Sequence, residues 1–205
     1  IARRDKPPIF SGLEYSLAHL DGKLPELLEQ LFPVVTPPDR EMLVSTRGGW
    51  TAYFDNSLGG NAATRVGYMC NELSCRGVAV SCAPHVQSSG DRGVYGAVTF
   101  DMFAPHATEF LNRLRSIRVV NNDGWEFFAI GPEQPFEEKE KYSSRRTVDR
   151  FTPEMLERYC LALGIDVFNA DFYGPTALMA TTRSPLPHTS LPLSRTEARA
   201  KLGLA

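Results

Sequence analysis

A glycine pair and an arginine at the start of a predicted helix could together hold an anion. Gly59 and Gly60 follow a predicted strand, and Asn61 can cap a helix whose first turn contains Arg65 and no acid. Because a helix N-terminus carries unpaired N–H groups and a positive dipole end, the junction could bind a phosphate or a carboxylate. The sequence of this junction matches neither the dinucleotide-binding motif nor the P-loop motif. We therefore favour the alternative, a plain turn from strand to helix.

Three arginines form a second candidate anion site. Arg145, Arg146 and Arg150 precede a predicted helix, and guanidinium groups bind phosphate and carboxylate bidentately. They could hold a nucleotide, a nucleic-acid backbone or an acidic partner. The alternative, which we favour, is that nearby acids neutralise them in surface pairs worth roughly 0–1 kcal/mol each. These acids are Glu137, Glu138, Glu140 and Asp149.

Three further side chains complete the candidate set. Asp55 directly follows a predicted strand, where it could act as an acid or a metal ligand, although turn formation is the commoner use of such a residue. Tyr53 and Trp125 lie in predicted strands and would normally be core residues. If they pointed outward beside the arginines, they would form a surface that binds protein or stacks on bases.

The cysteines and histidines indicate no catalytic or metal centre. We expect the four cysteines to be reduced, because they show no C-x-x-C spacing and are too sparse for a disulfide scaffold. Cys70 and Cys75 fall on one predicted helix about 140° apart, so we expect no shared ligand and no zinc site. The four histidines are scattered, and no hydrolase or metalloprotease motif occurs. No cofactor is predicted.

Composition limits the classes of partner. The 205 residues include 22 basic and 24 acidic side chains, a net charge of −2, so no overall field attracts nucleic acid or an anionic membrane. No apolar run approaches the ~18 residues of a membrane span. We expect a cytoplasmic protein that binds another protein, or alternatively a phosphorylated small molecule, with nucleic acid and membrane not expected as partners.

The first half of the chain mixes helix and strand signals. Leucines at helical spacing predict two short helices within residues 13–31, separated near Asp21 and Gly22. Residues 41–46 and 50–54 read as a hairpin with a glycine turn. A helix over 62–75 should end with Gly77 at its C′ position, and strands should follow at 77–83 and 93–103.

The second half is more strongly patterned. Asp123 and Gly124 predict a hairpin between strands 113–120 and 125–130. Residues 132–150 could form a solvated helix or an ordered loop across the sheet. Thr152, Pro153 and Gly164 delimit a helix over 153–163, and a short strand is expected at 176–181.

These elements predict an α+β fold, a single domain with a mainly antiparallel sheet flanked by helices, because the chain shows no regular βαβ alternation. The single domain should cover residues 9–183. A flexible segment precedes it at residues 1–8, and a proline-bearing tail follows at 184–205, where Ser194 and Glu197 could form a capping box.

Two stretches resemble segments of uncharacterised bacterial proteins. They are "GWTAYFDN" at 49–56 and "RRTVDRFTPEMLERYCLALGI" at 145–165, accompanied by the turn Glu133-Gln134-Pro135-Phe136. The resemblance implies a bacterial, cytoplasmic origin and carries no activity. With no assembled catalytic pattern in the sequence, we expect a non-catalytic protein-binding module of the accessory or immunity type. The alternative is an enzyme or binding domain that holds a phosphorylated small molecule between Gly59-Gly60 and the cluster Arg145–Arg150.

Overall fold

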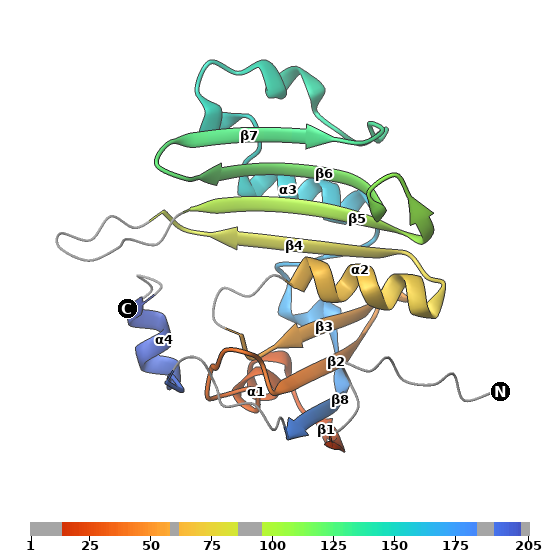
Figure 1. Ribbon diagram of the computed structural model, residues 1–205, viewed down its shortest axis with the longest axis vertical. Coiled ribbons are helices and arrows are strands. Elements are labelled where there is room, and N and C mark those ends of the chain that lie inside the picture. The colour runs from red at the N-terminus through yellow and green to blue at the C-terminus, as the bar shows by residue number, and fades with distance from the viewer. Residues whose placement is uncertain (1–13, 58–61, 86–95, 184–190, 202–205) are drawn as a thin grey trace. The chain divides into compact units, whose positions relative to one another are not determined.

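The chain has an α+β fold built on antiparallel strands. The computed structural model describes residues 14–57, 62–85, 96–183 and 191–201. These residues form two antiparallel four-stranded sheets, in the strand orders β1-β8-β2-β3 and β4-β5-β6-β7 (Figure 1). The sequence predicted the class and the antiparallel pairing, whereas the division of the strands between two sheets comes from the structure. The predicted residues 1–8, Gly59, Gly60, Asn61 and Val94 lie outside the described residues, as do residues 184–190 and 202–205 of the tail.

The two sheets belong to two compact units. The first unit contains residues up to Gly59 together with Tyr173–Ala198, and the second contains Gly60–Phe172 and the C-terminal residues from Arg199. The second unit is therefore inserted in sequence between two parts of the first. The sheet of the first unit depends on this return of the chain, because β8 pairs with both β1 and β2.

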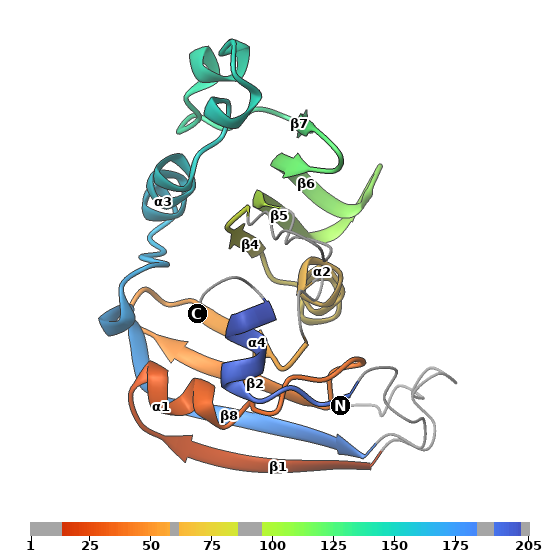
Figure 2. The ribbon, with the colours of Figure 1, turned by 90° about the vertical axis from the view of Figure 1, so that its left-hand side faces the viewer.

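The first unit consists of one sheet with a short helix over it. Its elements are β1 (Glu14–Asp21), α1 (Leu24–Glu29), β2 (Arg40–Thr46), β3 (Thr51–Asp55) and β8 (Tyr173–Arg183), and α4 (Arg195–Lys201) begins in it. Leu27 of α1 packs on Met42, Val44 and Ala177 of the sheet. Figure 2 shows α1 over one face of this sheet. The predicted hairpin at residues 41–54 is confirmed, with Gly49 at φ +75° in its turn.

The first predicted helix of this unit is wrong, because residues 14–21 form strand β1. Their leucine spacing is compatible with a helix, but all eight residues instead pair with β8, from Glu14 opposite Arg183 to Asp21 opposite Thr176. Backbone pairing with a neighbouring strand outweighs a weak local helical preference. The second predicted helix is present as α1. The capping box at Ser194 is also present, since the Ser194 N–H donates to Glu197 Oε2 at 2.8 Å.

The second unit places one helix on each side of its sheet. The strands β4 (Gly77–Ala83), β5 (Ala97–Thr108), β6 (Leu111–Asn121) and β7 (Trp125–Ile130) form an up-and-down meander. Helix α3 (Pro153–Ala162) packs on one face through Met155, Leu156 and Tyr159, and α2 (Ala62–Leu73) packs on the other through Ala63 and Cys70. Figure 2 shows the two helices on opposite sides of the strands.

The helix ends of this unit follow simple capping chemistry. Thr152 Oγ1 accepts a hydrogen bond from Met155 N at 3.4 Å, and Gly164 follows α3 at φ +76°, as predicted. Helix α2 differs from the prediction, since Ser74 at φ +50° takes the left-handed position and Gly77 begins β4. Gly77 is needed for a close approach, because a Cβ there would lie 2.2 Å from Cys70 Sγ.

The segment 132–150 is an ordered loop, one of the two predicted possibilities. It contains the 3-10 turns η2 (Lys139–Ser143) and η3 (Thr147–Asp149), and a third turn, η4 (Ala170–Phe172), precedes β8. Phe136 and Tyr142 of this loop pack against the core between α3 and the sheet. None of the described helices has the length and apolar character needed to cross a membrane.

Candidate functional site

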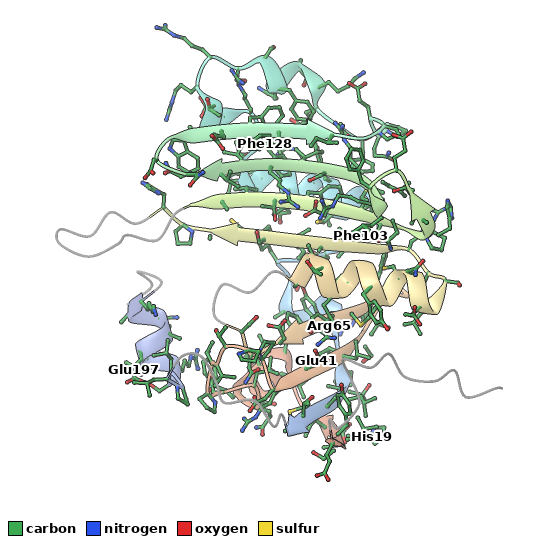
Figure 3. All side chains as sticks on the ribbon, in the orientation of Figure 1. His19, Glu41, Arg65, Phe103, Phe128 and Glu197 are labelled. Atoms are coloured by element: carbon green, nitrogen blue, oxygen red, sulfur yellow. The ribbon has the colours of Figure 1, made fainter. Side chains whose placement is uncertain are left out.

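One face of the second sheet carries a row of polar and aromatic side chains in exact register across its strands. Ser81 lies opposite Thr99, Thr99 opposite Arg118, and Arg118 opposite Phe128. Residues directly opposite in a sheet point to the same side, so these four share the side that faces away from α3. Helix α2 covers part of this side, where it packs on Ala79 and Phe103, and Phe128 and Ile130 lie in the part that remains exposed. We call this side the open face. Figure 3 labels Phe128 on β7 and Phe103 on β5, both of which lie on it.

A buried carboxylate organises the centre of the open face. The Asp101 side chain is only 2% exposed, and both of its oxygens lie 2.9 Å from an Nη of Arg118. Arg113 forms a second ion pair with this carboxylate, with its Nε 3.3 Å from Asp101 Oδ1. Arg118 Nε also donates to Ser116 Oγ at 3.0 Å. One carboxylate thus fixes two guanidinium groups that are each about one third exposed.

Arg113 is held by charge and by ring contact. Its Nε is buried without a hydrogen-bond acceptor among the described residues, and its guanidinium lies 5.8 Å from the ring centre of Phe103. A cation over an aromatic face is attracted by the ring quadrupole. Both contacts restrain the side chain before any ligand arrives, and such restraint lowers the entropy cost of binding through it.

Exposed apolar side chains lie beside these arginines. Phe128 is 43% exposed and Ile130 is 50% exposed, and both belong to the open face of β7. Glu126 lies on the same face and is also exposed. The charges of Arg113 and Arg118 are therefore matched by those of Asp101 and Glu126, so the face combines directed polar groups and an aromatic ring without a surplus of positive charge.

The predicted candidates Tyr53 and Asp55 lie together on β3 of the first unit. Tyr53 Oη donates to Asp55 Oδ2 at 3.4 Å, and Asp55 Oδ1 accepts from Ser57 N at 3.0 Å. The second bond is the local turn contact expected of a short acid after a strand. Asp55 therefore acts as a turn former in this structure.

The predicted arginine cluster is spread along the loop before α3. Arg146 Nε lies 3.7 Å from Asp149 Oδ2, and both side chains are exposed. Arg150 Nε donates to the Ser144 carbonyl at 2.9 Å, while its guanidinium lies 6.0 Å from the Phe127 ring centre. Arg145 is exposed. Of the acids expected to neutralise this cluster, Asp149 pairs with Arg146, whereas Glu137 pairs with Arg115 and Glu138 with Arg158.

The structure describes two of the remaining candidates, Arg65 and Trp125. Gly59 and Gly60 fall outside the described residues. Arg65 is half-buried in the first turn of α2, which contains no acid, as predicted. Trp125 begins β7 on the side of the sheet opposite Phe128, and its ring centre lies 5.4 Å from that of His85. The binding hypotheses for these residues stay predictions.

A buried polar network beside α3 was not predicted. Arg115 and Glu137, with side chains 3% and 0% exposed, form a bidentate pair in which Arg115 Nε lies 2.9 Å from Glu137 Oε1. Tyr142 Oη donates to Glu137 Oε2 at 2.9 Å. Arg115 and Glu137 lie 22 positions apart, and no sequence pattern connects them. The network anchors the 132–143 loop. Its guanidinium, carboxylate and phenol groups form hydrogen bonds with one another.

The direction of hydrogen bonding in this network can be assigned. Tyr142 Oη donates its only proton to Glu137 Oε2, so Tyr159 Oη is the donor in the bond of 3.1 Å between the two phenols. Tyr159 Oη also accepts from Glu138 N at 2.7 Å. Burial, followed by the contacts with Tyr159 and Glu137, raises the pKa of Tyr142 far above its ordinary value, and burial also raises the pKa of Tyr159. Both phenols are therefore uncharged donors.

Comparison of the chain with protein-family models, with curated proteins and with solved structures finds no match. Within the described ranges, no group of three or more histidine, cysteine, aspartate or glutamate side chains could hold a metal ion. Among the described residues, the open face brings two partly exposed arginines next to the exposed ring of Phe128. Its residues Asp101, Arg113 and Arg118 were missed in the sequence because their convergence depends on strand pairing.

Proposed function

We propose that the protein is a non-catalytic binding module whose open face recognises another protein. The observation that carries the proposal is the fixed pair Arg113 and Arg118 on Asp101, with the exposed ring of Phe128 directly opposite Arg118. Arginine and aromatic side chains contribute strongly to protein interfaces. A bacterial, cytoplasmic role of the accessory or immunity type belongs to the same proposal and rests on the sequence resemblance.

A protein partner fits this face better than a nucleic acid does. Nucleic-acid binding depends on a surplus of positive charge that releases counterions from the phosphate backbone. The two arginines here are balanced by Asp101 and by the exposed Glu126. A protein interface instead uses individually paired charges around an apolar centre, which matches Phe128 and Ile130 beside the arginines.

Site-specific photo-cross-linking tests the proposal. A photoreactive phenylalanine analogue replaces Phe128, and in a separate protein it replaces Leu161, which is 48% exposed on α3. We expect cross-linking of a partner protein in an extract of the source cells at position 128 and not at position 161. Adding Arg118→Ala to the position-128 protein should reduce that product on the order of 10-fold, the effect of losing a contact of about 1.4 kcal/mol.

Two controls make the outcome decisive. Circular dichroism must show that the Arg118→Ala protein is folded, and Glu109→Ala, an exposed change in the turn between β5 and β6, should leave the cross-link unchanged. Equal cross-linking at positions 128 and 161, or a product that survives Arg118→Ala in the folded protein, would contradict recognition through the open face.

The alternative function is binding of a phosphorylated small molecule near the start of α2. The specific observation that favours it is the first turn of α2, which contains Arg65 and no acid to compensate the helix dipole. Thermal unfolding with nucleotides and inorganic phosphate tests it, because a ligand of the native state raises the melting temperature. A shift that is lost in Arg65→Ala and kept in Arg118→Ala would favour this alternative.

A further inference from the structure

The end of helix α2 forms a Schellman motif with a cysteine at each of its two contacting positions. Ser74 adopts the left-handed conformation with φ +50° directly after the helix. The N–H of Cys75 donates to the carbonyl of Cys70 at 3.0 Å, and the N–H of Ser74 donates to that of Asn71 at 3.4 Å. These are the two hydrogen bonds that define the motif. Cys70 and Cys75 therefore occupy its C3 and C″ positions.

The motif brings these two side chains together. A contact between the C3 and C″ side chains commonly accompanies the backbone hydrogen bonds of a Schellman motif. The separation of about 140° predicted from the sequence assumed one helix through residue 75, and it is wrong because the helix ends at Leu73. In the structure Cys75 contributes, after burial, to the raised pKa of Cys70, which agrees with two neighbouring thiols. A disulfide requires Cα atoms roughly 4.4–6.8 Å apart. The hydrogen bond of 3.0 Å from Cys75 N to the Cys70 carbonyl brings the two backbones into direct contact.

The two thiols differ in exposure. Cys70 is 3% exposed and packs in the cluster with Ala63, Ala79 and Phe103, whereas Cys75 is exposed. Gly77 leaves space for the Cys70 sulfur, since any Cβ there would collide with it. One thiol is thus accessible to a dissolved oxidant, and the other is protected from it while remaining adjacent to the first.

We propose that Cys70 and Cys75 are a reversible dithiol–disulfide site, for which the oxidant is a low-molecular-mass disulfide such as oxidised glutathione. The Cys75 thiolate attacks one sulfur of the oxidant, forming a mixed disulfide and releasing one glutathione thiolate. The Cys70 thiolate then attacks the Cys75 sulfur and expels the second glutathione thiolate. The protein loses two electrons and two protons, and the oxidant becomes two molecules of glutathione.

The order of these steps follows from the surroundings of the two thiols. Burial, with a smaller contribution from Cys75, raises the pKa of Cys70 to about 11, so its thiolate is scarce and it reacts poorly with dissolved oxidants. Its attack on the mixed disulfide is intramolecular and gains from proximity. Cys75 is therefore the attacking residue and Cys70 the resolving residue, and the disulfide closes a short loop at the end of α2.

Mass spectrometry of the folded, reduced protein treated with oxidised glutathione tests this assignment. We expect an intramolecular disulfide between Cys70 and Cys75 in peptide maps of the wild-type protein. In Cys70→Ala the glutathione adduct at Cys75 should persist, with its loss slowed on the order of 10-fold or more, because the intramolecular step is absent. In Cys75→Ser, Cys70 should remain a thiol.

The controls separate the site from general cysteine chemistry. Cys82→Ser removes the other exposed cysteine and should leave the Cys70–Cys75 disulfide unchanged. The exposed Cys75→Ser change keeps the test valid even if the buried Cys70→Ala change prevents folding. A stable glutathione adduct at Cys75 of the wild-type protein, or a disulfide from Cys75 to Cys82 in its place, would overturn the proposal.

Discussion

Asp101 has the most consequential side chain of the open face, because a single carboxylate serves two arginines. Its burial removes it from water, and the two guanidinium groups replace its hydration. The arrangement exposes arginines whose positions are already fixed. A partner that supplies a carboxylate or a backbone carbonyl would therefore meet donors that need no reorganisation.

We predict that Asp101→Asn destabilises the protein by about 1–3 kcal/mol, because the change leaves two neighbouring arginines without their counterion. Partial exposure of both arginines keeps the cost below that of a fully buried pair. The free energy of unfolding in urea measures the effect. The matched change Glu126→Gln alters an exposed acid of the same face and should cost less than about 0.5 kcal/mol. Equal effects of the two changes would contradict the role given to Asp101.

The buried tyrosines predict a loss of stability at alkaline pH. The folded-state pKa values of Tyr142 and Tyr159 are raised above the ordinary value of 10.0, chiefly by burial. Above about pH 10 the unfolded chain releases phenol protons that the folded chain retains, so the free energy of unfolding falls as pH rises. The stabilising contribution is fully present below that pH.

The fall in the free energy of unfolding at alkaline pH should be smaller in Tyr142→Phe, because this change removes one of the two titrating phenols. Urea denaturation between pH 8 and 11 provides the measurement. Tyr68→Phe, the same change at a tyrosine that is 44% exposed on α2, should retain the wild-type dependence on pH. If both variants lose stability with pH as steeply as the wild type, the phenol network is not its source.

At the scale of elements, a β-bulge in β6 determines which arginines lie on the open face. Phe103 pairs with Arg113 and Met102 pairs with Arg115, so β6 contains one extra residue at this point. Without it, strict alternation would place Arg113 and Arg118 on opposite faces of the sheet, since they lie five positions apart. The bulge turns Arg113 toward Asp101 and leaves Arg115 on the α3 side, where it binds Glu137.

The end of α2 offers an element-scale prediction. Ser74 adopts the left-handed conformation at φ +50°, which an L-residue with a Cβ occupies at a cost. We expect Ser74→Gly to raise the free energy of unfolding by about 1 kcal/mol, because glycine is the preferred residue at this position. Ser143→Gly, at an exposed serine in η2, should give no such gain. A loss of stability in Ser74→Gly would show that the serine side chain has a role of its own.

For the whole molecule, strand β8 joins the C-terminal part of the chain to the N-terminal part, because it pairs with both β1 and β2. The strand lies between β1 and β2, yet it follows the entire second unit in sequence. The core of the first sheet includes Ala177 of β8, whereas the core beneath α3 contains no residue of that strand. The C-terminal part of the chain is therefore needed for the N-terminal sheet.

We predict that removing residues 173–205 abolishes the first sheet and preserves the second. Hydrogen exchange followed by mass spectrometry should show lost protection in β2 and β3, with protection retained in β5 and β6. The full-length protein provides the comparison. The single domain predicted for residues 9–183 would instead require both sheets to lose protection together, so the same measurement tests that prediction.

Local sequence patterns were sufficient for much of the fold. Thr152 and Gly164 fix the ends of α3, and Asp123-Gly124 fixes the β6–β7 hairpin, because these residues act on backbone groups within a few positions. The same locality explains the failure at residues 14–21. Their conformation is set by pairing with β8, about 160 positions away, and a weak leucine pattern carries no information about that strand.

The sequence by itself determined the α+β class, the antiparallel hairpins and the capped helices, since each depends on interactions between near neighbours in the chain. Only the tertiary structure decided the sites. Asp101 meets Arg113 and Arg118 through strand pairing and a bulge, and Cys70 meets Cys75 because α2 ends at Leu73. The arginines converge on Asp101 through contacts whose register is fixed by packing of the whole unit. The two cysteines meet at a helix end that no glycine marks, because Ser74 takes the left-handed position, so the amino-acid spacing alone showed neither site.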